Sequence, residues 1–226
     1  MAIGKSVGWG LTPHLAKAAP DLSARFVHES MRRALHGVGP LPGAAAAADK
    51  VLAEEHGDVD RAVRQLIETH VRLAGVQGFA TNIGGIATAA VAIPANIAGV
   101  ALLQCRLVAA IAHLHGYDVE DQRVRNAVLT CILGEGTVKT LVRRGSLPTT
   151  PMAMATAPTY DPQLDRVIAA EVTAELLRKV AGKRVARTVA RQVPVVGGFV
   201  GAGTDGVATW QIGRYADREL VRRTRR

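Results

Sequence analysis

The sequence of 226 residues has few aromatic side chains. Phe, Trp and Tyr make up only 4% of it, although hydrophobic residues of all kinds reach 48%, so the core must be built mainly from Ala, Val, Leu and Ile. This composition favours closely packed helices over a β-sandwich, which usually contains more Tyr, Phe, Trp and Thr. No segment demands a strand, and we predict an all-α fold.

Cysteine is also scarce. The two cysteines, Cys105 and Cys131, each fall in an apolar helical pattern with no framework of further cysteines around them. Such isolated residues fit a reducing compartment and a packing role, although a disulfide between them stays open. The first twenty residues lack the apolar core of a secretion signal. We therefore expect a cytoplasmic protein.

Charge is absent from one long run, Leu73–Cys105, which is rich in Gly and Ala and is interrupted at Pro94. A second, shorter run of this kind is Val193–Thr204. Small residues four apart, such as Gly85 and Ala89 or Gly197 and Gly201, permit close helix packing, so the two runs could pack on each other. We predict a compact multi-helix domain built around a Gly/Ala-rich central helical hairpin that is split at Pro94.

The length of the run Leu73–Cys105 also suits a membrane, since a transmembrane helix needs about 20 apolar residues. Its many Ala and Gly residues contribute little to insertion, and Pro94 and Asn96 leave polar groups to satisfy in hydrocarbon. Three interpretations remain: a buried hairpin, a shallow or re-entrant insertion, and a true span. The weak hydrophobicity favours the buried hairpin.

Polar residues inside the uncharged runs form the candidate site. If buried, they need hydrogen-bond partners, which neighbouring helices or a small ligand could supply. One interpretation is hydrogen bonding between helices, and the other is a pocket for a small ligand or a lipid headgroup. The candidates are Asn82, Asn96, Gln104 and Asp205, together with Arg214, which follows Asp205 by nine residues.

Acidic residues are scarce at the end of the chain. Residues 178–226 contain twelve Lys or Arg and three Asp or Glu, so this section carries the whole net charge of +9. On a helix, Lys183, Arg184, Arg187 and Arg191 share one side, and the second uncharged run follows directly. With Trp210 and Tyr215 beyond, the pattern indicates binding to an anionic membrane surface. A solvated helix face is the simpler alternative. Nucleic acid is disfavoured because no recognised motif or stacking platform accompanies the charge.

Constellations that would indicate catalysis are missing. The seven histidines do not cluster at metal-ligand spacing, and no serine-centred elbow or pair of catalytic carboxylates stands out. Residues 201–206 match GxGxxG by letter, but too few residues follow to complete a dinucleotide-binding unit. We predict no cofactor and no metal, and the sequence favours a non-enzymatic protein without excluding an enzyme.

Turn residues divide the chain into helical segments. We predict helices near 21–37, 44–56, 59–74, 95–116, 118–134, 164–191 and 208–220, with Asp58 and Asp118 as N-terminal caps. The composition of Gly145–Gln163, with its four prolines, predicts a linker or a long surface loop. Residues 1–43 form an N-terminal helical extension in this scheme, and residues 44–226 form the main domain.

Two motifs in order resemble the EcsC family of bacterial proteins. They are GFATNIGGIATAAVAIPANIAGVALLQCRLVAAIAHLHGYD (Gly78–Asp118) and PVVGGFVGAGTDGVATWQIGRYA (Pro194–Ala216), and His56–Gly75 fits as well. The resemblance spans roughly Leu52 to Leu220, apart from the Pro-rich segment, so the main domain is EcsC-like. It implies a helical, membrane-associated protein without agreed catalytic residues; the family name comes from a protein encoded beside an ABC transporter.

These observations lead to two functional hypotheses. The first is a non-enzymatic protein bound peripherally to the cytoplasmic face of the inner membrane, or to a membrane protein, through its basic C-terminal section. The alternative is a soluble helical module whose internal pocket binds a lipid or another small hydrophobic ligand. The sequence leaves open whether the protein forms a homo-oligomer.

Overall fold

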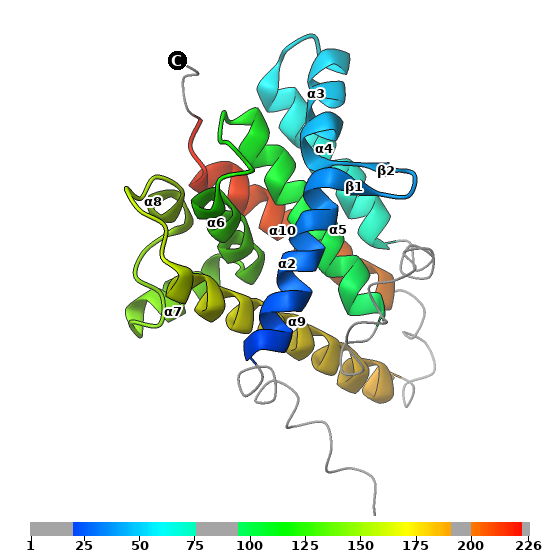
Figure 1. Ribbon diagram of the computed structural model, residues 1–226. Coiled ribbons are helices and arrows are strands. Elements are labelled where there is room, and N and C mark those ends of the chain that lie inside the picture. Colours follow the sequence, from blue (N-terminus) through cyan, green and yellow to red (C-terminus); the bar gives the residue numbers. More distant parts are fainter. Residues whose placement is uncertain (1–19, 76–94, 191–199, 223–226) are drawn as a thin grey trace, which may run out of the picture.

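The computed structural model describes residues 20–75, 95–190 and 200–222, although the side chains of residues 20–23, 75, 95–97, 179–190 and 200–204 are outside the description. Figure 1 shows a bundle of helices, which confirms the all-α prediction. The elements are α2 (Pro20–His36), β1 (Gly37–Val38), β2 (Leu41–Pro42), α3 (Ala44–Glu54), α4 (Val59–Gly75), α5 (Ala95–Leu114), α6 (Gln122–Leu133), α7 (Glu135–Arg143), α8 (Pro151–Ala155), α9 (Pro162–Ala190) and α10 (Val200–Glu219).

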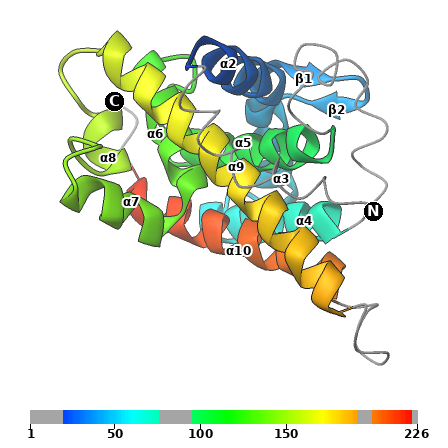
Figure 2. The same cartoon turned by 90° about the horizontal axis from the view of Figure 1, so that it is seen from below.

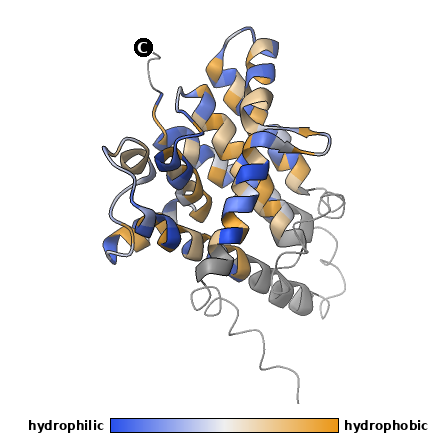
Figure 3. Ribbon diagram, in the orientation of Figure 1, coloured by the Kyte–Doolittle hydropathy of each residue, from blue (hydrophilic) through white to orange (hydrophobic). Residues whose placement is uncertain are grey.

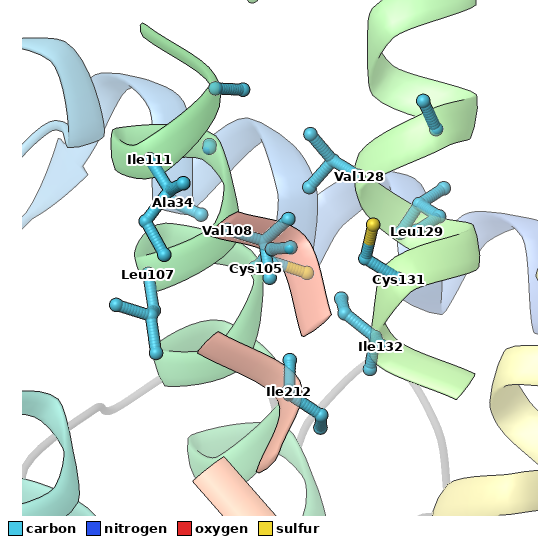
Figure 4. Packing of buried hydrophobic residues seen from close by; sticks show 14 of the residues in the cluster. Ala34, Cys105, Leu107, Val108, Ile111, Val128, Leu129, Cys131, Ile132 and Ile212 are labelled. Carbon is cyan, nitrogen blue, oxygen red and sulfur yellow. The ribbon is translucent and has the colours of Figure 1, made fainter. Parts of the chain in front are cut away.

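Helix α5 is the centre of the bundle. It contacts α2, α3, α4, α6 and α10, and every residue from Ala98 to Ala112 except Val100 is buried. Figure 4 shows Cys105, Val108 and Cys131 packed in this core. Both cysteines are free, and burial raises the pKa of the Cys105 thiol to about 12. The second half of the uncharged central run is therefore protein core, whereas its first half, residues 76–94, lies outside the described residues.

Helix α10 packs between α4 and α5 with its direction fixed by contacts along its length. It runs antiparallel to α4, because Gly206 lies against Val71 and Gly213 against Ile67. It runs parallel to α5: Gly213 also touches Leu107, and the carbonyl of Leu220 accepts a hydrogen bond from His115 Nδ1 at 2.6 Å. The predicted pairing of the two uncharged runs stays a prediction, because these contacts lie outside both runs and the side chains of residues 200–204 are outside the description.

Two local features differ from the sequence-based expectations, and a third agrees with them. The cap of α6 is Asp121, whose carboxylate accepts from the Arg123 amide, and not Asp118, whose carboxylate instead accepts from the Glu120 amide in the preceding turn. The turn at Gly37–Gly43 contains the two-residue hairpin of β1 and β2, in which Gly37 has a φ of +90° that glycine adopts without strain. Asp58 caps α4 as predicted.

The Pro-rich segment 145–163 is folded against the domain. It contains α8, which packs on α6, and Leu147 and Met154 are buried there. Its prolines act as helix starts, since Pro151 opens α8 and Pro162 opens α9. A linker was the wrong interpretation of this composition.

Core residues before position 44, such as Phe26 and Met31, belong to the same apolar cluster as those after it. The proposed boundary at 43/44 stays a prediction.

The contact at Gly213 yields a stability prediction. A Cβ there would lie 2.8 Å from Ile67 Cγ1 and 3.1 Å from Leu107 Cδ2, and both neighbours are fully packed. We expect Gly213→Leu to lower the free energy of unfolding by about 2–3 kcal/mol through overpacking. Urea unfolding, monitored by circular dichroism, measures this change in the free energy of unfolding.

The same substitution at Gly136 is the control, because this helical glycine is exposed with no atom within 4 Å of an added Cβ. Gly136→Leu should leave the midpoint unchanged or raise the free energy of unfolding by up to ~0.8 kcal/mol through helix propensity. Equal unfolding midpoints for the two variants would contradict the packing described here.

Candidate functional site

Four helix termini meet at one end of the bundle, which we call the loop end. Because α10 is antiparallel to α4 and parallel to α5, its first residue, Val200, lies on the side where α4 ends at Gly75 and α5 begins at Ala95. Figures 1 and 2 show the end of α9 (Ala190) on this side too, next to the start of α10. The stretches 76–94 and 191–199, both outside the described residues, connect these termini.

The basic residues predicted to bind a membrane belong to this end. Helix α9 continues to Ala190, so Lys183, Arg184 and Arg187 stand on helical backbone, while their side chains and the whole of Arg191 lie outside the description. From residue 179 to residue 204 the chain contains five Lys or Arg and no acidic residue. The fold therefore brings the end of α9 to the same end of the bundle as Gly75, Ala95 and Val200, which border the stretches 76–94 and 191–199.

The middle of α10 presents two large apolar side chains to solvent. Val207 is 56% exposed and Trp210 is 51% exposed, and their spacing of three places them on one side of the helix. Trp210 also lines a groove of about 450 Å³ between α10 and α7. Tyr215, expected to act with Trp210, is instead buried in the core.

The cations further along α10 have intramolecular partners. Arg214 lies 3.3 Å from Asp217, Arg218 lies 2.7 Å from Glu135, and Arg222 lies 2.6 Å from Asp60. These pairs are exposed, and each contributes little to stability. They nevertheless place a carboxylate beside each of these arginines, whereas residues 179–191 contain five Lys or Arg and residues 223–226 contain three Arg, with no acidic residue in either stretch.

The predicted polar residues are not gathered into one pocket among the described residues. Asn82 lies outside the description, as does the side chain of Asn96 in the first turn of α5. Gln104 is fully buried in α5, and neither its amide oxygen nor its amide nitrogen has a hydrogen-bond partner. Arg214 lies at the surface, where it pairs with Asp217 and not with half-buried Asp205.

A buried polar cluster that the sequence did not reveal joins α4, α5 and β2. Arg106 is only 6% exposed, and its Nε donates to the Pro42 carbonyl at 2.9 Å. Its Nη1 lies 3.4 Å from His70 Nε2, and His70 Nδ1 donates to the Leu66 carbonyl at 2.8 Å. The partners stand 36 and 64 residues apart, so no local pattern could have indicated them.

The Arg106 guanidinium has no carboxylate partner among the described side chains. Among the described side chains, no acidic group lies within ion-pair distance of Arg106, and the stretches 1–19, 76–94, 191–199 and 223–226 contain no Asp or Glu. Burial, helped by the neighbouring Arg106, lowers the pKa of His70 to about 4. His70 is therefore neutral at pH 7 and can accept the Arg106 hydrogen bond.

His70 makes the fold acid-sensitive. The unfolded chain takes up a proton at His70 as pH falls through 6.5, whereas the folded protein does so only near pH 4. Between these values the unfolded state binds more protons, so stability decreases as pH falls, by up to about 3 kcal/mol at His70.

We expect His70→Gln to remove most of this loss in urea unfolding at pH 7 and pH 4.5. An unchanged pH dependence of the free energy of unfolding in this variant would contradict the role given to His70. The control is His56→Asn, at an exposed histidine.

Within residues 20–75, 95–190 and 200–222, none of the helices combines the length and hydropathy required to traverse a bilayer. The same residues contain no group of three or more His, Cys, Asp or Glu side chains placed to bind a metal ion.

Comparison with known proteins identifies the family. The sequence profile of the EcsC protein family matches residues 56–224, about three quarters of the chain. No curated protein and no solved structure shows significant similarity to it. The matched range contains α4, α5 and α10, the helices that form the packed centre, together with the basic end of α9. The chain therefore belongs to the EcsC protein family.

Proposed function

We propose that this EcsC-family protein is a non-enzymatic protein that binds peripherally to an anionic membrane surface, at the cytoplasmic face of the inner membrane, with its loop end. The observations that carry the proposal are the acid-free basic stretch in the last turns of α9, at the loop end, and the exposed Val207 and Trp210 further along α10. Cations next to exposed apolar and aromatic side chains are the combination that interfacial proteins use.

Electrostatic attraction supplies the larger share of this binding. A Lys or Arg near an anionic bilayer contributes about 1 kcal/mol, and residues 179–204 contain five of them with no acid to offset them. The helical spacing of Lys183, Arg184, Arg187 and Arg191 puts them on one side, so they can face a flat surface together. The attraction decreases with ionic strength, since salt screens exposed charges.

Apolar contact adds to the attraction. Trp210 suits the level of the lipid headgroups because its indole has an apolar body and a polar N–H. Val207, one turn earlier, would be covered by the same contact. Helix α5 takes no part in the proposed insertion, because burial by its neighbouring helices already removes its apolar surface from water.

The alternative, an internal pocket for a lipid or another small hydrophobic ligand, stays a prediction. In the described part of the chain, α5 is enclosed by side chains. The open clefts described among these residues contain charged side chains in their walls, which suits a hydrophobic ligand poorly.

Charge reversal in α9 tests the proposal. We expect the wild-type chain to sediment with vesicles of phosphatidylcholine and phosphatidylglycerol at low salt, and not with phosphatidylcholine alone. Replacing Lys183, Arg184, Arg187 and Arg191 with Glu should abolish sedimentation, because four attractive charges become repulsive. Added salt should release the wild-type protein.

A variant of equal charge controls for non-specific attraction. It carries Glu at Lys50, Arg61, Arg143 and Arg144, which are exposed on α3, α4 and α7 and just after α7. This variant should sediment like the wild type. In a Trp9→Phe background, the emission of Trp210 should also shift to the blue on binding. Equal losses in both charge variants, or no sedimentation of the wild type at low salt, would overturn the proposal.

A further inference from the structure

A basic cleft lies away from the loop end, between α2, α6 and the segment from Tyr160 to Asp165. Its volume is about 670 Å³, within the range of small-molecule sites. Figures 1 and 2 show α9 beside both α2 and α6, and its first turn closes the cleft. Asp165 is 25 residues from Ala190, about 37 Å along the helix, so the cleft is separate from the proposed membrane contact.

Helix α2 supplies one wall through residues that recur every three or four positions. Arg25, His28, Glu29, Arg32 and His36 share the side of the helix opposite buried residues such as Val27 and Ala34. Figure 3 shows this as hydrophilic bands along α2. Opposite stands Arg125 of α6. In total, four arginines in the lining face two carboxylates, Glu29 and Asp165.

Both carboxylates are already engaged by side chains of the cleft. Glu29 accepts from Arg32 Nη2 at 2.7 Å and from Arg33 Nε, and these hydrogen bonds, that of Arg32 above all, lower its pKa to about 2. Asp165 lies 2.9 Å from His28 Nε2. Among the described side chains, Arg25 has no carboxylate within ion-pair distance. The cleft therefore keeps a positive charge at pH 7.

Helix α6 adds to the positive potential. Gln122 is its first residue and Arg125 stands one turn later, so the start of α6 lines the cleft with a cation, while the Asp121 carboxylate caps the helix itself. Arg125 uses two of its donors, toward Glu120 and toward the Val119 carbonyl, which leaves three N–H groups for a ligand. Arg123 donates to the Ala157 carbonyl and so holds the segment that leads to Tyr160.

The base of the cleft is apolar. Met31 and Leu129 line it and are almost completely buried, while Gln122 and Tyr160 add neutral hydrogen-bonding groups. A ligand that matches the whole lining combines an anionic group with three or more acceptor oxygens and an uncharged portion. A phosphate monoester has this combination, and guanidinium groups bind phosphate through paired N–H donors.

We propose that the cleft binds a phosphorylated small molecule. Its phosphate contacts Arg25, Arg32 and Arg125 beside the start of α6, and its uncharged portion rests on Met31 and Leu129. Binding here is independent of the membrane contact at the loop end, because different helices and different arginines carry it.

Titration calorimetry of the full chain with phenyl phosphate tests this proposal, with inorganic phosphate as a probe of the anion alone and benzyl alcohol as an uncharged control. We expect phenyl phosphate to bind more tightly than inorganic phosphate, and benzyl alcohol not to bind. Arg25→Gln combined with Arg32→Gln should weaken binding about tenfold to a hundredfold, the effect expected when charged hydrogen bonds are lost. Both side chains are exposed, so folding should be unaffected, which circular dichroism checks.

The matched control is Arg143→Gln combined with Arg144→Gln, which removes the same charge elsewhere and should not change the affinity. Vesicles with and without phosphatidic acid separate the two sources of a phosphate monoester. If the cleft variant loses binding to phosphatidic acid vesicles but the α9 charge-reversal variant keeps it, the phosphate comes from a lipid headgroup. Absence of phenyl phosphate binding to the wild type, or equal affinity in the cleft and control variants, would overturn the proposal.

Discussion

Burial of α5 on every side is the constraint on which the rest of the structure depends. A helix surrounded by others must present small side chains for close approach, and α5 does so with Ala98, Ala101, Ala109, Ala110 and Ala112, all buried. The neighbours adapt in the same way: Gly213 lets α10 reach α5 and α4 together. The Gly/Ala-rich character that suggests a membrane segment is thus explained, for this half of the run, by helix packing in the protein core.

Because the core is closely packed and apolar, most of the described charged side chains lie at the surface. Among the described residues, Arg106 and Glu171 are exceptions, and Arg106 remains in the core by donating to a carbonyl and to a neutral histidine. The excess positive charge then appears in two places with different surroundings. At the loop end it adjoins exposed apolar side chains, which favours a bilayer, whereas in the cleft it surrounds a concave apolar base, which favours a small phosphorylated ligand.

Local features of the fold could be predicted from the sequence, and contacts between distant segments could not. Helix periodicity and glycine stops placed α2, α3, α4 and α6 to within a few residues. Two aspartates three residues apart made the cap of α6 ambiguous, because Asp118 and Asp121 can both accept backbone hydrogen bonds. The cleft required α2 to face α6 across about ninety residues of chain, and composition alone carries no information on that approach. For the loop end, the sequence supplied the basic stretch, and the fold added exposed Trp210 and excluded Tyr215.

Hydrogen exchange of the backbone amides, with and without anionic vesicles, tests the central claim most directly. We expect α5 to stay in the protein core with and without vesicles, and the loop end to contact the membrane. Amides of residues 98–112 should be the most protected in solution and unchanged by vesicles, while residues 179–190 and the first half of α10 should gain protection. Rapid exchange in α5, or a change of its protection on vesicle binding without one in α9, would contradict the account.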